Sequence, residues 1–162
     1  MGSASRIRET FLVQKTKVFF IDLAISNKVR HTCEVVGKLY EQGFTITVYT
    51  SNSSSKHTLD RMLWTWEQDS FIPHTTKIHF SAMDEPVLIT EEENIPVITD
   101  ALIQFDPLPT EKLSAYKLII DFAEVYDSTK KIKSRERYKK IRSSGNFELE
   151  YLKLGEFLRK QV

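Results

Sequence analysis

The sequence predicts an α/β fold in which helices flank a mostly parallel central sheet, giving three layers. Two continuous apolar runs, Lys17–Leu23 and Tyr116–Phe122, have the composition of strands that are covered on both faces. Strand, helix and strand patterns follow one another within about 35 residues, which is the length of a right-handed crossover unit. The 162 residues, 41% of them hydrophobic, suit one compact domain with a buried core.

Predicted strands and helices alternate in the first half of the chain. Lys17–Leu23 is the expected central strand, and Asn27–Gln42 follows it with apolar residues at helical spacing. Phe44–Thr50 is rich in β-branched residues and alternates, as strands do. The polar turn Ser51–Ser55 then leads into a helix over Lys56–Trp66.

The second half of the chain is less regular. Val87–Thr90 and Ala101–Phe105 are short apolar runs with too little chain between them for a crossover helix, so we expect a loop connection or a partly antiparallel pair. We expect one domain over residues 16–147, a flexible N-terminal extension over 1–15 and a C-terminal extension over 148–162. The last segment has apolar residues at near-helical spacing: Tyr151, Leu152, Leu154, Phe157 and Leu158.

Several classes of function lack support in the sequence. The turns after the first two predicted strands, Ala24–Asn27 and Ser51–Ser55, contain no glycine, so neither matches a phosphate-binding glycine loop. No nucleophile-elbow signature or metal-ligand spacing is recognisable. A single cysteine, Cys33, and the lack of a signal-peptide pattern or a membrane-length apolar segment favour a cytoplasmic protein. We therefore expect no enzyme, no cofactor, no metal and no membrane partner.

The most concentrated charge lies in Lys130–Arg142, which holds eight basic residues and one acid, Glu136. This segment carries a net charge of +7, which leaves −6 for the rest of the chain. Ser128 is a suitable N-cap and Gly145 a suitable stop, so the pattern predicts a helix over 128–144. The pattern fits either a solvated helix face or a site for an anionic partner. Helical spacing places five residues on one face: Lys131, Arg135, Tyr138, Lys139 and Arg142.

A second unusual feature is the run Asp69–His74, which places large apolar residues in a proline-containing loop close behind Trp64 and Trp66. The run is either a hydrophobic plug that closes the end of the sheet or an exposed anchor for a protein partner. The frequent burial of aromatic residues favours the plug.

Four short blocks, in order and at suitable spacing, carry a resemblance to a known family. They are L-D-R-M-L-W at Leu59–Trp64, S-F-I-P-H at Ser70–His74, D-F at Asp121–Phe122 and R-E-R-Y-K at Arg135–Lys139. Together with the chain length and the order of strands and helices, they resemble the chi subunits of bacterial DNA polymerase III over roughly residues 17–148.

The resemblance implies a Rossmann-like sheet without nucleotide-binding loops and an accessory, non-catalytic role in the clamp-loader assembly. Chi proteins join the replisome to single-stranded-DNA-binding protein by receiving its acidic C-terminal tail, which ends in phenylalanine. By similarity, the receiving site includes Lys131, Arg135, Tyr138 and Lys139. We expect the cations to pair with the carboxylates of the tail, and Phe122 to help Tyr138 wall a pocket for the terminal ring.

The resemblance also implies a second partner surface, at Trp64, Phe71 and Pro73. In the family this surface contacts psi, the small subunit that tethers chi to the clamp loader, or another replication or repair partner such as a helicase. On this basis the loop around Phe71 is an anchor and not a plug. We expect the isolated chain to be a monomer.

Two alternatives remain open. A nucleic-acid-binding module would use the basic helix 128–144 on phosphates, although we expect no specific nucleic-acid binding from a chi-like protein. A small nucleotide-dependent α/β enzyme is disfavoured because its phosphate loop is missing.

Overall fold

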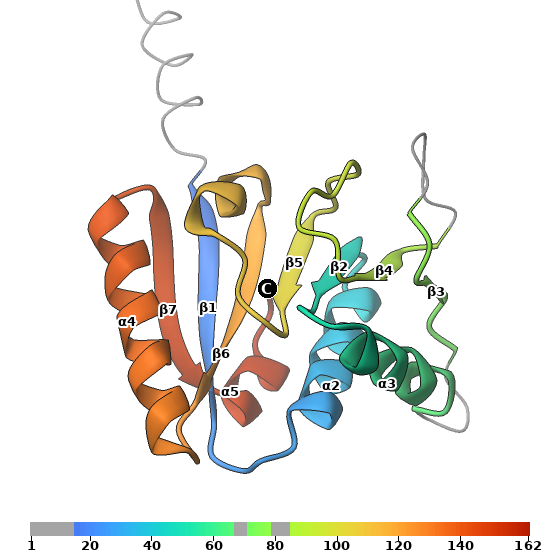
Figure 1. Cartoon of the computed structure of the whole chain (residues 1–162), viewed down its shortest axis with the longest axis horizontal. Coiled ribbons are helices and arrows are strands. Elements are labelled where there is room, and N and C mark those ends of the chain that lie inside the picture. Colours follow the sequence, from blue (N-terminus) through green and yellow to red (C-terminus); the bar gives the residue numbers. More distant parts are fainter. Residues whose placement is uncertain (1–14, 67–70, 79–84) are drawn as a thin grey trace, which may run out of the picture.

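The computed structural model describes residues 15–66, 71–78 and 85–162. Within these ranges seven strands form one sheet in the order β3-β4-β2-β5-β6-β1-β7, and every neighbouring pair is parallel. Helices cover the two faces of this sheet (Figure 1), which confirms the predicted three-layer α/β fold. The strands are β1 (Thr16–Leu23), β2 (Ile46–Tyr49), β3 (His74–Thr75), β4 (Val87–Thr90), β5 (Ala101–Gln104), β6 (Leu118–Glu124) and β7 (Phe147–Lys153).

Two helical layers enclose the sheet. One layer is formed by three helices that pack against a cluster containing Phe19, Ile21 and Leu23 of β1. The other layer is formed by α4 and a 3₁₀ segment, which pack against a cluster containing Val18 and Phe20 of the same strand. Because successive strand residues point to opposite faces, the continuous apolar run of β1 supplies both clusters. The helices are α2 (Lys28–Glu41), α3 (Ser53–Trp64), α4 (Ser128–Ser144) and α5 (Leu154–Arg159), and the 3₁₀ segment is η1 (Thr110–Ala115).

Of the two arrangements expected for Val87–Thr90 and Ala101–Phe105, the loop connection is present and the partly antiparallel pair is wrong. These segments form β4 and β5, which lie on opposite sides of β2 and both run parallel to it. Each strand is only four residues long, so the return path spans roughly 13 Å, at about 3.3 Å per residue. The chain between Thr90 and Ala101 is therefore long enough to make the return without a helix.

The C-terminal segment differs from the helical pattern expected for it. Phe147–Lys153 forms β7, an edge strand parallel to β1, and only Leu154–Arg159 is helical. Phe147 and Leu149 pack on the α4 side of the sheet and Leu152 on the other side, which is the two-residue period of a strand. The near-helical spacing of Tyr151 and Leu152 was misleading because both are strand residues. The predicted N-terminal extension lies outside the described residues except for Lys15.

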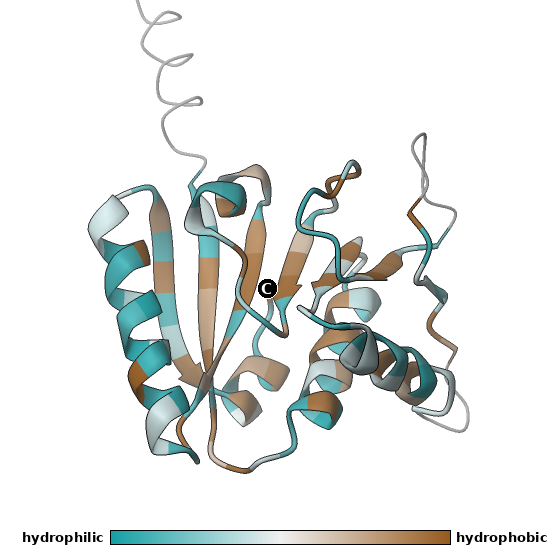
Figure 2. Cartoon of the chain, in the orientation of Figure 1, coloured by the Kyte–Doolittle hydropathy of each residue, from teal (hydrophilic) through white to brown (hydrophobic). Residues whose placement is uncertain are grey.

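Helix α4 is unusual because it docks on the sheet with few apolar contacts. Figure 2 shows it as mostly hydrophilic, whereas the strands beside it carry hydrophobic bands. Of its seventeen residues only Ser134 and Ile141 are buried. The helix is held by a bidentate ion pair instead: Arg137 donates from Nη2 to Asp121 Oδ1 at 2.9 Å and from Nε to Asp121 Oδ2 at 3.1 Å. Asp121 of β6 is 1% exposed, so this ion pair lies between the inner face of the helix and the sheet.

The Asp121 carboxylate has further support. Gln104 of β5 donates from Nε2 to Asp121 Oδ2 at 3.3 Å, while its own Oε1 accepts from the Leu108 amide at 2.7 Å. Burial raises the pKa of the Asp121 carboxyl, and the contact with Arg137 opposes this rise. The network therefore ties β5, β6 and α4 together through polar contacts whose partners are all satisfied.

We expect Asp121→Ala to lower the free energy of unfolding by about 3–5 kcal/mol, because it leaves the Arg137 guanidinium partly buried without a counterion. Urea unfolding followed by circular dichroism measures the loss. The control is Lys117→Ala, which removes an ion pair to Asp100 at 3.8 Å from a lysine with 85% of its side chain exposed, and should cost less than about 1 kcal/mol. Equal losses in the two variants would contradict the role given to Asp121.

Candidate binding site on α4

Helix α4 follows β6 directly and has well-defined ends. The side chain of Asp127 accepts a hydrogen bond from the Lys130 amide at 2.9 Å, so the N-cap is Asp127 and not Ser128. Gly145, with φ 73°, adopts the left-handed conformation that ends the helix. The chain then turns into β7, and α4 packs against β6 and this edge strand, beside which Figure 1 shows it.

A cavity of about 600 Å³ lies between α4 and three strands, β1, β6 and β7. All four residues predicted for the receiving site line it: Lys131, Arg135, Tyr138 and Lys139. Arg142, the fifth residue of the predicted helical stripe, lines it as well. The structure therefore brings together the whole cationic and aromatic stripe of α4 on one concave surface.

The floor of this cavity is apolar. Tyr138 packs edge-to-face on Phe20 of β1, with ring centroids 5.0 Å apart and an interplanar angle of 70°. Ala123 and Val125, at the end of β6, are small lining residues that leave room beside the rings. A flat or ring-shaped apolar group could be buried here while its polar end stays near the cations.

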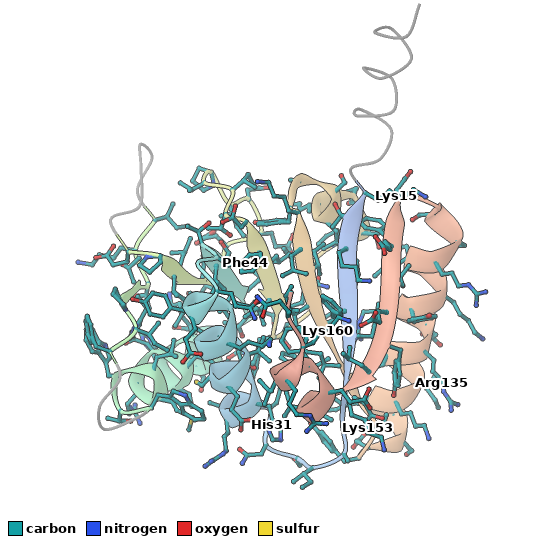
Figure 3. All side chains as sticks on the ribbon, turned by 180° about the vertical axis from the view of Figure 1, so that it is seen from behind. Lys15, His31, Phe44, Arg135, Lys153 and Lys160 are labelled. Atoms are coloured by element: carbon teal, nitrogen blue, oxygen red, sulfur yellow. The ribbon has the colours of Figure 1, made fainter. Side chains whose placement is uncertain are left out.

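The cations of the cavity are not used by the fold. Among the ion pairs between described residues, none includes Lys131, Arg135, Lys139 or Arg142. Arg137 is bound to Asp121 on the inner side of the same helix. Figure 3, seen from behind, shows Arg135 on α4 beside the edge of the sheet, with Lys153 at the end of β7 nearby. The positive charge of this face is therefore available to an anionic ligand.

Phe122 does not lie in this cavity. It is 1% exposed and packs in the cluster on the opposite face of the sheet, with Phe19 and Ile21. Its neighbours on β6, Asp121 and Ala123, face α4, so strand alternation turns Phe122 away from that helix. The aromatic residue beneath Tyr138 is Phe20 instead.

Two aromatic lining residues were missed in the sequence, Phe20 and Tyr151. Phe20 lies in an apolar run whose residues all look like core residues, so the sequence does not distinguish it as a site residue. Tyr151 is 51% exposed and comes from β7. Interpretation of F-E-L-E-Y as an alternating strand would have placed Tyr151 on the same face as Phe147 and Leu149.

The second predicted surface lies at the opposite end of the sheet. Trp64, the last residue of α3, is 56% exposed, and Phe71, close before β3, is 63% exposed. Their ring centroids are 5.6 Å apart. Pro73 is half-buried in the same segment, and the neighbouring Ile72 is buried. The segment thus inserts Ile72 into the core and leaves Phe71 outside, while Asp69 and Ser70 of the predicted loop lie outside the described residues.

This surface is held in place by His74. Its Nδ1 lies 2.7 Å from the carbonyl oxygen of Ile72, and its Nε2 lies 3.1 Å from Asp60 Oδ1 on α3. The His74 ring also packs on Trp64, with centroids 4.6 Å apart. The structure therefore brings Trp64 and Phe71 together as one exposed aromatic pair on a supported base.

The first turn of α4 takes part in a charge network with the end of β6. Glu124 accepts from Lys28 Nζ at 3.0 Å, lies 3.3 Å from Lys130 Nζ and accepts a hydrogen bond from the Tyr126 hydroxyl. Burial alone would raise the pKa of Glu124, but the Tyr126 bond and the two lysines outweigh it and lower the pKa below its ordinary value. The network joins α2, β6 and α4 at the carboxyl-terminal ends of the strands.

Neither a metal centre nor a membrane span emerges from residues 15–66, 71–78 and 85–162. No three His, Cys, Asp or Glu side chains in these ranges are arranged to hold a metal ion. No helix in the same ranges has the length and apolar character needed to cross a bilayer. The fold and the site together define an α/β protein whose cavity beside α4 is cationic at the rim and aromatic at the base.

Comparison with known proteins specifies the class further. The family model described as DNA polymerase III chi subunit, HolC, matches residues 16–148. The chain is 26% identical over 114 residues to the DNA polymerase III subunit chi of Escherichia coli (strain K12), covering 70% of this chain and 77% of that protein. It is 24% identical over 105 residues to a protein of Rickettsia prowazekii (strain Madrid E) named "Probable DNA polymerase III subunit chi", covering 60% of this chain and 64% of that protein.

The chain belongs to the family of DNA polymerase III chi subunits, because the family model matches most of its length. This confirms the resemblance found in the sequence. Chi is an accessory subunit of DNA polymerase III, so family membership also confirms the expectation of a non-catalytic role in DNA replication.

The Glu124 network predicts a specific dependence of stability on pH. Because its folded-state pKa is lowered, Glu124 contributes stability above its ordinary pKa of 4.5, and this contribution is lost as the pH falls through the folded-state value. We expect Glu124→Gln to be less stable than the wild type at neutral pH and the two to converge as the pH falls below 4.5. Urea unfolding across this range tests the expectation, and a stability difference that does not change with pH would contradict it.

Proposed function

We propose that this protein binds the acidic C-terminal tail of single-stranded-DNA-binding protein and links that protein to the clamp loader of DNA polymerase III. The observation that carries the proposal is the cavity on α4, where four cations without ion-pair partners among the described residues surround the aromatic base formed by Phe20 and Tyr138. Membership in the chi family supports the same function.

The proposed binding mode follows from the chemistry of the lining. The carboxylates of the tail pair with Lys131, Arg135 and Lys139, and the planar guanidinium of Arg135 can hold one carboxylate bidentately. The terminal phenylalanine ring packs against Tyr138 and Phe20 and displaces water from the cavity. Charge attraction brings the acidic tail to the site. Burial of the ring makes the site selective for a tail that ends in an aromatic residue.

The position of the two surfaces supports an adaptor role. The cavity lies beside β7, and the Trp64 and Phe71 pair lies beside β3, which are the opposite edges of the sheet (Figure 1). Two partners could therefore bind at once without contact between them. We propose psi, or an equivalent clamp-loader or helicase partner, for the surface formed by Trp64, Phe71 and Pro73.

The alternative is a nucleic-acid-binding module in which α4 contacts phosphates. The cations of α4 suit phosphates as well as carboxylates. The apolar base of the cavity favours the peptide, because phosphate contacts need no ring-sized recess beneath the cations. Binding to bare single-stranded DNA separates the two functions.

We expect an Asp-rich peptide ending in phenylalanine to bind the wild-type chain, and the double variant Arg135→Ala, Tyr138→Ala to bind it more than about tenfold less tightly. Isothermal titration calorimetry measures both affinities. Lys133→Ala is the matched control, since Lys133 is an exposed cation of the same helix outside the cavity lining.

The peptide affinity should fall as salt is raised, because charge pairs dominate the encounter. Equal affinity for the wild type and the double variant would contradict the site. Tight binding to bare single-stranded DNA, with no binding to the peptide, would favour the alternative function.

We expect Phe71→Asp to abolish binding of psi or its equivalent while leaving peptide affinity unchanged, because a carboxylate at the centre of an aromatic anchor opposes its burial. Co-elution on size-exclusion chromatography tests the first outcome and calorimetry the second. Simultaneous loss of both interactions would instead assign the segment around Phe71 a structural role.

A further inference from the structure

A second tyrosine faces the cavity from the edge of the sheet. Tyr151 lies on β7 and lines the cavity together with Tyr138 of α4. Its ring is 51% exposed, although the residue sits on a regular strand next to the core. The matched family region ends at residue 148, so Tyr151 lies beyond it.

The position of the Tyr151 ring is fixed from two directions. In the parallel pairing of β1 and β7, Tyr151 lies directly beside Phe20, the residue on which Tyr138 packs. At the other end of the ring, the hydroxyl donates to Asp22 Oδ2 on β1 at 2.9 Å. Burial and the Asp22 bond raise the pKa of Tyr151 to about 12, so the hydroxyl stays protonated and keeps donating at neutral pH.

Three rings therefore border one recess. Phe20 forms its base, and Tyr138 and Tyr151 come from different elements, a helix and a strand. Arg135 lies near enough to Tyr151 to lower the pKa of its phenol in opposition to the effect of Asp22. A ligand that carries a ring and an adjacent carboxylate matches this arrangement, because the ring can enter between the tyrosines while the carboxylate meets the guanidinium.

We propose that Tyr151 determines specificity at this site by forming the second wall against the terminal aromatic ring of the bound peptide. The inference rests on the proposed function of the cavity as the receptor for an acidic C-terminal segment. Tyr151 is half-exposed in the free chain, and contact with the ring removes its apolar surface from water.

The test is a double-mutant cycle between protein and peptide, measured by calorimetry on the full chain. The protein is wild type or Tyr151→Ala, and the Asp-rich peptide ends in phenylalanine or in alanine. We expect Tyr151→Ala to weaken binding of the phenylalanine peptide about five- to tenfold and of the alanine peptide less than about twofold. Equal losses with the two peptides, or no loss, would overturn the inference.

Two further variants separate the contribution of the Tyr151 ring from that of its hydroxyl and from general effects of mutation. Tyr151→Phe keeps the ring and loses only the bond to Asp22, so it should retain affinity within about threefold of the wild type. A loss as large as that of Tyr151→Ala would show that the hydroxyl, and not the ring, contributes the binding. Ile98→Ala, which shortens an exposed apolar side chain outside the cavity lining, should leave both affinities unchanged.

The outcomes distinguish this inference from the function on which it rests. If the wild type binds neither peptide, the proposed function fails and the role of Tyr151 fails with it. If the wild type binds the phenylalanine peptide and Tyr151→Ala binds it equally well, the receptor function stands and only the role of Tyr151 is rejected.

Discussion

The bidentate contact between Arg137 and Asp121 holds α4 in its rotation, and the candidate binding surface depends on that rotation. Of the many cations of the helix, Arg137 turns inward to a buried carboxylate on β6, and Ile141 and Tyr138 pack on the same face of the sheet. Consecutive helical residues are separated by about 100°. With Arg137 directed at the sheet, Tyr138 comes to rest on Phe20, and Arg135 faces the cavity beside β7. The basic helix thus has a structural side, which carries Arg137, and a side that lines the cavity.

The same sheet separates the two proposed partner surfaces. All its described strands run in one direction, and the order of strands places α4 and β7 at one edge and β3 at the other. The strands between them are buried on both faces and form a rigid spacer. This geometry keeps the two proposed partner surfaces apart, as the proposed connector function requires.

The sequence is sufficient to predict an element where a local residue pattern is compatible with only one structure. The continuous apolar run of Lys17–Leu23 and the basic stripe of α4 were predicted correctly, because burial on two faces and helical periodicity each leave a direct signature. Relations between elements were harder. In the sequence, Arg137 cannot be distinguished from the neighbouring cations. Only the fold shows that it pairs with Asp121. Phe20, and not the predicted Phe122, lies beneath Tyr138, because the face of the sheet that α4 covers decides which strand residues it meets, and no local pattern encodes that face.

The most direct test of the central claim is an NMR titration of the ¹⁵N-labelled chain with the Asp-rich peptide ending in phenylalanine. If the cavity beside α4 receives the peptide, the largest chemical-shift changes occur at the amides of Lys131–Arg142 and at Tyr151, with the segment around Phe71 unchanged. Changes centred on Trp64 and Phe71, with none on α4, would contradict the account.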